Sequence, residues 1–227
     1  MIYVTGDVHA PHDIKKLNTD NWPDQKTLTR NDYLIVCGDM GLVWDLSKHD
    51  LWWQKWFEDK SFTTLFVDGN HENHPALAQY PVEMWNGGKI HRIQPHVIHL
   101  MRGQVYNING TTVFAMGGAS SHDKPWRVEG ISWWPEELPS NEEYAEAERN
   151  LEANDWQVDL VVSHCTANSV QEQLAYWYEH DDLTNFFEMV VHEKLDYRHW
   201  YFGHYHQDKD IDDLHTCLYQ GIEQIRI

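Results

Sequence analysis

Five short hydrophobic runs recur along this chain, and each one stops abruptly at polar residues. The runs are rich in β-branched and aromatic residues and are too short for buried helices, so they predict strands. They cover residues 1–5, 33–37, 63–67, 158–162 and 200–202. Because open α/β sheets bind ligands at the carboxyl ends of their strands, we expect the polar residues that follow these runs to form one site.

The residues that follow the five runs are carboxylates, imidazoles and one amide. They are Asp7 and His9, Asp39, Asn70 and His71, His164, and His204 and His206. A glycine precedes the polar residues in four of the five places, which allows a sharp turn and a close backbone approach. Within each pair separated by one residue, alternation along a strand end predicts that both side chains point the same way.

The segments between these runs complete an α/β pattern. Helical spacing of apolar residues predicts helices over residues 47–60, 72–79, 140–154, 168–179 and 184–195. Short strands separated by glycine, asparagine and proline predict an antiparallel meander over 82–85, 89–93, 97–101, 105–108 and 112–116. Closing strands are expected at 197–202, 215–219 and 222–227, and residues 117–139 form a long loop. Two facing sheets flanked by helices would satisfy this order.

Composition narrows the class of protein. A chain of 227 residues with 41% hydrophobic residues and 12 tryptophans predicts one globular domain over residues 1–227. The net charge of −19 argues against binding to long nucleic acid or to anionic lipid. Phosphate substrates stay compatible with it, since bound cations would reverse the local field. The sequence does not predict the oligomeric state.

Cysteine usage and hydropathy predict the compartment. Three cysteines, Cys37, Cys165 and Cys217, are expected to be buried free thiols in a reducing cytosol. No apolar run reaches the length of a membrane span, and the first predicted strand leaves no room for a signal peptide. We therefore expect a cytoplasmic protein that does not bind a membrane.

Oxygen and imidazole donors without thiolates suit Mn, Fe, Zn, Co or Ni better than Ca, and do not match a structural zinc site. The seven candidate metal ligands are Asp7, His9, Asp39, Asn70, His164, His204 and His206. Seven groups are too many for one ion with an open position. They suit two divalent ions that share a bridging carboxylate, which in two-metal hydrolases lie about 3.5–4 Å apart.

Taken together, the motifs resemble the five blocks of the calcineurin-like metallophosphoesterase superfamily, in that family's order. They are Asp7-Val8-His9, Gly38-Asp39, Gly69-Asn70-His71-Glu72, His164 and Gly203-His204-Tyr205-His206. The resemblance implies a four-layer α/β/β/α sandwich of two mixed sheets, the metallo-dependent phosphatase fold. It further implies one metal on Asp7, His9, Asp39 and His206, and a second on Asp39, Asn70, His164 and His204. Asp39 would bridge the two.

The same resemblance implies hydrolysis of a small phosphomonoester or phosphodiester by a metal-bridging hydroxide, with manganese the ion expected to support activity in vitro. His71 matches the family's histidine that acts as general acid or stabilises charge; the alternative is that it only orients a ligand. The segment after Asp39 lacks the arginine of protein Ser/Thr phosphatases, so the chain looks more like the small phosphoesterases of bacterial and phage type. A nuclease and a non-catalytic scaffold of the same fold remain alternatives.

Two features of the loop and the first long helix are open to more than one interpretation. Arg127 could donate two hydrogen bonds to a substrate phosphate, or form a surface ion pair with Glu129 or Asp123. Trp52 and Trp56 are expected to pack against the sheet. The loop tryptophans, Trp126, Trp133 and Trp134, could stack on an aromatic leaving group or simply fold the loop down.

Overall fold

The central strands of this chain are buried on both faces, which places a sheet between two hydrophobic layers. We describe a computed structural model that covers residues 1–174 and 177–226. In strand β2 (Tyr33–Cys37), Leu34 and Val36 point into an outer core, whereas Ile35 and Cys37 point into a core shared with the second sheet. Strands of this kind occur where both faces of a parallel sheet are covered.

The first sheet has seven strands in the order β13-β1-β2-β3-β6-β5-β4. Their bounds are β1 Ile2–Thr5, β2 Tyr33–Cys37, β3 Thr63–Val67, β4 Val82–Trp85, β5 Gly88–Gln94, β6 Val97–Leu100 and β13 Ile222–Gln224. Strands β1, β2, β3 and β6 pair in parallel, and in this register Ile35 lies opposite both Val4 and Leu65. The carboxyl ends of β1, β2 and β3 therefore meet at one edge.

The second sheet has six strands in the order β11-β12-β10-β9-β8-β7. Their bounds are β7 Gln104–Ile108, β8 Thr111–Met116, β9 Leu160–Ser163, β10 His199–Phe202, β11 Lys209–Asp210 and β12 His215–Cys217. Strands β8, β9, β10 and β12 pair in parallel. Strand β11 is not predicted by the sequence, because two charged, exposed residues give no strand signal.

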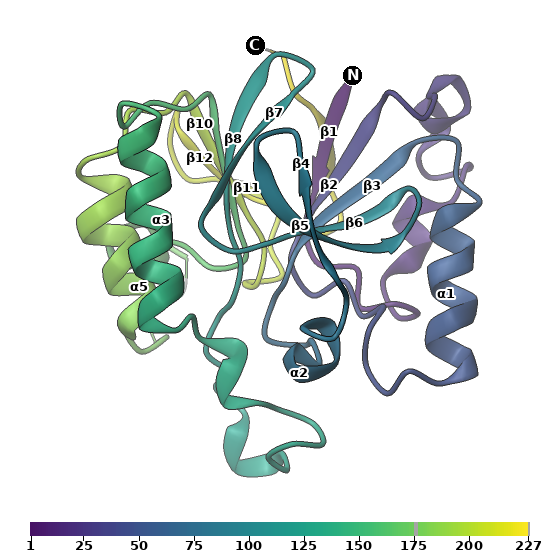
Figure 1. The fold of residues 1–227 in the computed structure, drawn as a ribbon, viewed down its shortest axis with the longest axis horizontal. Coiled ribbons are helices and arrows are strands. Elements are labelled where there is room, and N and C mark those ends of the chain that lie inside the picture. The colour runs from purple at the N-terminus through teal and green to yellow at the C-terminus, as the bar shows by residue number, and fades with distance from the viewer. Residues whose placement is uncertain (175–176, 227) are drawn as a thin grey trace.

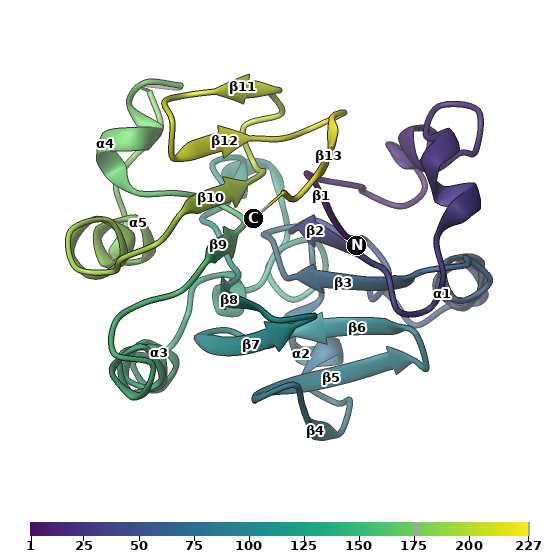
Figure 2. The ribbon, with the colours of Figure 1, turned by 90° about the horizontal axis from the view of Figure 1, so that it is seen from above.

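Helices cover the outer face of each sheet and complete the four layers. The helices are α1 Lys48–Glu58, α2 His74–Leu77, α3 Asn141–Ala153, α4 Asn168–Gln171 and α5 Asp182–Phe186. Helix α1 lies on the outer face of the first sheet, where it contacts β5 and β6, whereas α3 contacts β7 of the second sheet and α5 lies on the same side as α3 (Figures 1 and 2). Between the sheets, Ile35 and Leu65 pack with Leu160 and Val162. The predicted α/β/β/α fold is confirmed.

The predicted antiparallel meander is correct in its strands but is divided between the two sheets. Strands β4–β5, β5–β6 and β7–β8 pair antiparallel as predicted, whereas β6 and β7 do not pair, because β6 belongs to the first sheet and β7 to the second. The chain changes sheets at Met101–Gly103, where Gly103 has φ +70°. Strand length and turn residues do not reveal such a crossing, because a parallel partner for β6 and for β8 comes from distant sequence.

The helices differ from prediction mainly at their ends. Ser140 starts α3 with the expected capping box, in which its side chain and that of Glu143 bond reciprocally. The helix predicted over 168–179 ends at Gln171 as α4, and its positions 175 and 176 lie outside the described residues. The helix expected over 184–195 begins earlier, at Asp182, and becomes a π-helix over Phe187–His192. The closing strand ends at Gln224, and residue 227 is not described.

Packing predictions for two groups of side chains had different outcomes. The prediction for Trp52 is wrong, because this residue is 57% exposed on the outer face of α1, whereas Trp56 is half-buried against the outer core. The three cysteines are buried free thiols, as predicted. None of the helices formed by residues 1–174 and 177–226 is long and apolar enough to span a bilayer.

A buried ion pair anchors the loop beyond the second sheet to the end of β3. The guanidinium of Arg102 donates to Asp68 Oδ2 at 2.9 Å through Nε, and to the Glu136 carbonyl at 2.9 Å through Nη2. His99 Nε2 lies 3.1 Å from the other Asp68 oxygen. Asp68 thus follows a strand like the site residues, yet it serves the packing of the 117–139 loop.

Substituting Arg102 by Met should destabilise the protein by about 3–5 kcal/mol, because the Asp68 carboxylate would stay buried without its cation. Urea unfolding measures the loss. The matched control is Arg149→Met, since Arg149 is exposed and its ion pair with Glu142 is worth only about 0–1 kcal/mol. Equal losses in the two variants would contradict the anchoring role.

Candidate functional site

The loops that follow five strands meet at one edge of the two sheets. Strands β1, β2 and β3 contribute from the first sheet, and β9 and β10 from the second. These loops bring together all seven predicted ligands and His71. Donor atoms within 4.8 Å of one another form three overlapping groups: Asp7, His9 and His206; His9, Asp39 and His71; and Asp7, Asp39 and His164.

Loop conformation, rather than strand alternation, orients the paired residues. Strand β1 ends at Thr5 and β10 at Phe202, before the pairs begin. His9, His204 and His206 all have left-handed backbone, with φ of 41°, 66° and 50°. The prediction that the pleat of a strand aligns each pair is therefore wrong. Non-glycine residues in this region cost conformational energy and cluster at functional sites.

Two glycines leave room for the ligands of the opposite sheet. A Cβ atom on Gly38 would lie 2.1 Å from His164 Nδ1, and one on Gly203 would lie 2.2 Å from Asp7 Oδ1. Gly38 also has φ +92°, which a side chain would strain. Gly38 and Gly203 are therefore required by the contact between the two sheets at this edge.

Asp39 lies at the centre of the constellation. Its Oδ2 is 3.1 Å from His9 Nε2 and 3.3 Å from His164 Nε2. Its Oδ1 accepts the backbone N–H of His71 at 2.7 Å. One carboxylate oxygen thus faces an imidazole from each sheet.

The hydrogen bonds of His164 fix its tautomer. Its Nδ1 lies 2.8 Å from the Cys37 carbonyl, which can only accept, so Nδ1 carries the proton. In the neutral ring Nε2 then presents a lone pair to Asp39 Oδ2 and to Asn70 Oδ1, the latter at 3.2 Å. Asn70 presents its oxygen because its Nδ2 donates to Ser121 Oγ. Positive charge must therefore lie among these three atoms, either as a second proton on Nε2 or as a cation.

His9 shows the same arrangement. Its Nδ1 lies 2.8 Å from Asp13 Oδ2, and this carboxylate favours a proton on Nδ1. In the neutral ring the lone pair is therefore on Nε2, the atom that faces Asp39. Metal-bound histidines characteristically donate their second ring N–H to a carboxylate or carbonyl, as His9 and His164 do here.

Asp7 contributes a buried oxygen that lacks a hydrogen bond. Its Oδ1 accepts the His204 backbone N–H at 2.9 Å. Among the described residues Oδ2 has no hydrogen bond of regular geometry, although His206 Nε2 lies 3.0 Å away. A cation held by Asp7 Oδ2 and His206 Nε2 would give both atoms a partner. His206 is held in place by its stacking on Tyr219, with ring centroids 4.6 Å apart.

The electrostatics of the site favour added positive charge. Burial opposes protonation of His9 and His164, but Asp39 and Asp7 outweigh it and raise both pKa values to about 9. Burial, assisted by His164, lowers the pKa of His204 to about 3, which keeps this ring neutral. Although burial opposes its ionisation, His164 and His9 hold the pKa of Asp39 well below its usual range. Metal binding requires neutral imidazoles, so a divalent cation would displace the second proton of His9 and of His164. The donor set therefore suits divalent cations.

His71 and Arg127 lie together beside these ligands. Arg127 Nη2 is 2.7 Å from His71 Nε2, and Arg127 Nε forms an ion pair of 2.7 Å with Asp123. Since a guanidinium only donates, His71 Nε2 accepts in this structure. Burial lowers the pKa of His71 against the pull of Asp39, and Arg127 lowers it further. Arg127 therefore forms an ion pair and also points toward the site, although the sequence presents these two roles as alternatives. Its partner in the ion pair is Asp123 and not Glu129.

Several residues that support the site are not predicted from sequence. They are Asp13, Lys16, Ser121, Tyr178 and Tyr219. Asp13 had a usable signal, since a carboxylate four residues after His9 can reach its ring in a compact turn. Tyr178 and Tyr219 had none, because their contacts with His204 and His206 depend on the tertiary fold.

A cavity of about 250 Å³ opens over this constellation. It is lined by Asp39, Asn70, His71, His122, Asp123, Arg127, Tyr178, His204, Tyr205 and His206. Cations on one side and a guanidinium with an imidazole on the other suit a tetrahedral oxyanion such as a phosphoryl group.

Comparison with known proteins agrees with this chemistry. The family profile for calcineurin-like phosphoesterases matches residues 1–208 of the chain. A search of curated proteins finds no significant match. Members of the matched family are metal-dependent phosphoesterases, and its match covers the five loops that build the site. The chain belongs to the calcineurin-like phosphoesterase family.

Proposed function

We propose that this protein is a binuclear metal-dependent phosphoesterase that hydrolyses a small phosphomonoester or phosphodiester. The observation that carries the proposal is the convergence of His9, His164 and Asn70 around the buried Asp39 carboxylate, where Nδ1 of each histidine is already bonded to a carboxylate or a carbonyl. Protons on the two imidazoles supply the positive charge that this arrangement requires, and divalent cations would replace them. The acidic net charge of −19 favours small substrates over long nucleic acid.

The proposed ligand sets are those that the family resemblance implies, and the first of them includes the spatial group of Asp7, His9 and His206. Asp7, His9, Asp39 and His206 would hold one ion, and Asp39, Asn70, His164 and His204 the other. Two divalent cations held there would supply Lewis-acid stabilisation of phosphoryl oxygens and would lower the pKa of an attacking water. Manganese is the ion we expect to support activity in vitro. An intact donor set with His71 beside it favours an enzyme over a scaffold that would be free to lose these residues.

His71 and Arg127 would act on the substrate directly. A phosphate group in the 250 Å³ cavity offers Arg127 a charged acceptor, to which the guanidinium can donate instead of to His71. His71 Nε2, no longer an acceptor for the guanidinium, would take up a proton from water and then donate it to the leaving-group oxygen. Asp123 would keep the guanidinium oriented during this exchange.

Manganese should raise the melting temperature of the metal-free protein, and Asp39→Asn should abolish most of this effect, because one bridging charge is lost to both ions. At a metal concentration of 100 Kd the stabilisation should be about 2.7 kcal/mol. Elemental analysis should find two ions per chain in the parent protein. The control Asp59→Asn changes an exposed carboxylate and should keep both ions. Full metal content in Asp39→Asn would rule out the bridge.

His71→Ala should lower turnover of p-nitrophenyl phosphate or its bis ester by about 10²–10⁴-fold while both ions are retained, because the leaving oxygen loses its partner. His180→Ala, at an exposed histidine paired with Glu172, is the matched control. Initial rates and metal content are measured together. Unchanged turnover in His71→Ala would show that this residue only orients its neighbours, and no hydrolysis of any phosphoester by the metal-loaded parent would refute the proposed function.

Arg127→Met should reduce kcat/KM by about 10–100-fold, since a charged hydrogen bond to phosphate contributes about 1.5–3 kcal/mol. The reduction should come largely from KM, because the positive charge binds ground state and transition state alike. Arg198→Met removes an exposed arginine that pairs with Asp159 and should leave both constants unchanged. Wild-type kinetics in Arg127→Met would assign this arginine to loop structure alone.

A further inference from the structure

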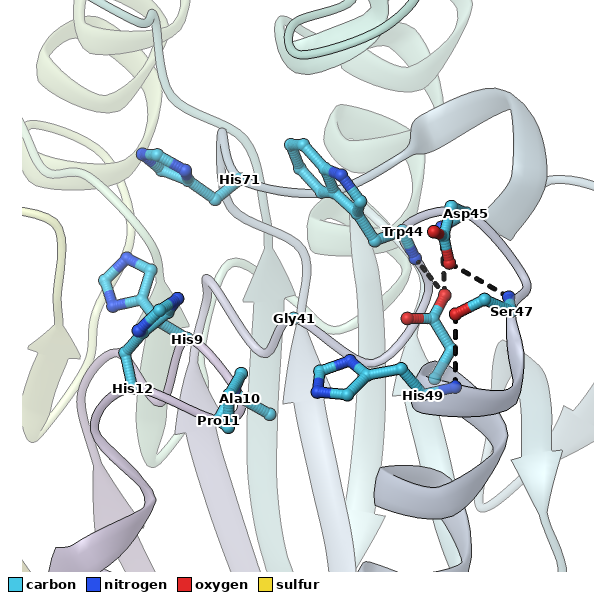
Figure 3. A pocket seen from close by; sticks show the side chains of 11 residues that line it. His9, Ala10, Pro11, His12, Gly41, Trp44, Asp45, Ser47, His49 and His71 are labelled. Atoms are coloured by element: carbon cyan, nitrogen blue, oxygen red, sulfur yellow. Dashed lines mark hydrogen bonds between the residues drawn. The ribbon is translucent and has the colours of Figure 1, made fainter.

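A second cavity adjoins the metal centre on the side of His71. Its volume is about 380 Å³, and it shares His9 and His71 with the metal centre. Figure 3 shows Trp44 and His71 on one rim, and His12 and His49 along the opposite side. The functional site described above makes no use of this space.

Trp44 is held rigidly in the wall of this cavity. The buried carboxylate of Asp50 accepts its backbone N–H at 2.7 Å and those of the next two residues at 2.9 Å each. Its ring meets Trp134 edge to face, with centroids 5.2 Å apart and planes at 85°. Of the three loop tryptophans, Trp134 thus folds the loop down onto Trp44. A half-buried ring fixed in this way is a preformed surface for a flat ligand.

The polar groups of the cavity select against a second anion. His49 Nε2 accepts from Trp53 Nε1 at 3.1 Å, so the neutral His49 ring carries its proton on Nδ1 and can donate there. Among the described residues that line the cavity there are two aspartates, Asp45 and Asp50, and no lysine or arginine. The wall therefore offers an aromatic face, an imidazole donor and negative charge.

The position of His71 connects this cavity with the one above the metal ligands. His71 lines both of them. A third cavity, on the side of Tyr178 and His204, is not lined by His71. If the phosphoryl group lies over the ligands and His71 faces the leaving oxygen, the rest of the substrate extends past His71 toward Trp44.

We propose that the cavity beside Trp44 binds the organic group of the substrate, and that this group is an uncharged or cationic planar aromatic ring stacked on the indole. The inference rests on the proposed function, because the phosphoryl group is taken to occupy the metal centre. The substrate class is thus an aryl or heteroaryl phosphoester rather than a polyphosphate or a simple alkyl phosphate.

Non-hydrolysable phosphonates separate binding of the organic group from catalysis. Phenylphosphonate should bind the manganese-loaded protein at least about 10-fold more tightly than methylphosphonate, as stacking on one aromatic side chain allows. Isothermal titration calorimetry measures both affinities. A phenylphosphonate that carries a para carboxylate should lose most of this advantage, because Asp45 and Asp50 lie in the wall.

Variants of Trp44 locate the effect. Trp44→Ala should remove most of the difference between the two phosphonates, whereas Trp44→Phe should keep most of it, which separates stacking from a general disturbance of the loop. Trp52→Ala, at an exposed tryptophan on α1, is the matched control and should keep the full difference.

Equal affinities for the two phosphonates, a difference that survives in Trp44→Ala, or no binding of either ligand would each overturn the proposal. These outcomes differ from a failure of the proposed function. A protein that binds phenylphosphonate through Trp44 but hydrolyses no phosphoester would retain the aromatic site and lose the enzymatic assignment. A protein that hydrolyses phosphoesters equally well with and without Trp44 would retain the enzymatic assignment and lose the aromatic site.

Discussion

Two buried carboxylates that face imidazoles from both sheets are the constraint on which this edge of the molecule depends. Asp7 and Asp39 are almost completely buried, and Asp39 Oδ2 lies 3.3 Å from His164 Nε2 of the other sheet. The apolar core between the sheets, built around residues such as Ile35 and Leu160, holds these loops close together. The site is therefore preorganised for cations, because packing keeps the buried negative charge in place before any ion binds.

The surroundings of the ligands reinforce this preference. The Cys37 carbonyl and Asp13 orient the two imidazoles from outside, so that Nε2 of each ring faces Asp39. Beneath the site, the buried ammonium of Lys16 donates to the backbone carbonyls of Gly6 and Asp7. Burial lowers the pKa of Lys16 to about 8, although Asp7 opposes the shift. This cation holds the first loop in place without occupying the positions where metal ions would bind.

The sequence identified the donor atoms better than it identified their orientation. Residue type and strand position were enough to select Asp39 and His164, because parallel strands place their carboxyl ends together. The left-handed backbone of His9 and His206 was not predictable, since the strand ends before the loop begins. The change of sheet after β6 was also missed, because it is decided by pairing between residues far apart in sequence. The contact between Trp44 and Trp134 was not predicted either, because these two residues are also far apart in sequence.

His71 connects the two halves of the proposed substrate site, and Arg127 determines whether His71 Nε2 accepts or donates a hydrogen bond. As long as the guanidinium donates to Nε2, at 2.7 Å, the imidazole cannot donate to a leaving group. An anion that draws Arg127 away changes this hydrogen bond without moving His71, whose backbone N–H is fixed on Asp39 Oδ1 at 2.7 Å. The order of events follows from this geometry: the phosphoryl group must engage Arg127 before His71 becomes available to the leaving oxygen. A ligand that fills only the aromatic cavity would leave that hydrogen bond intact.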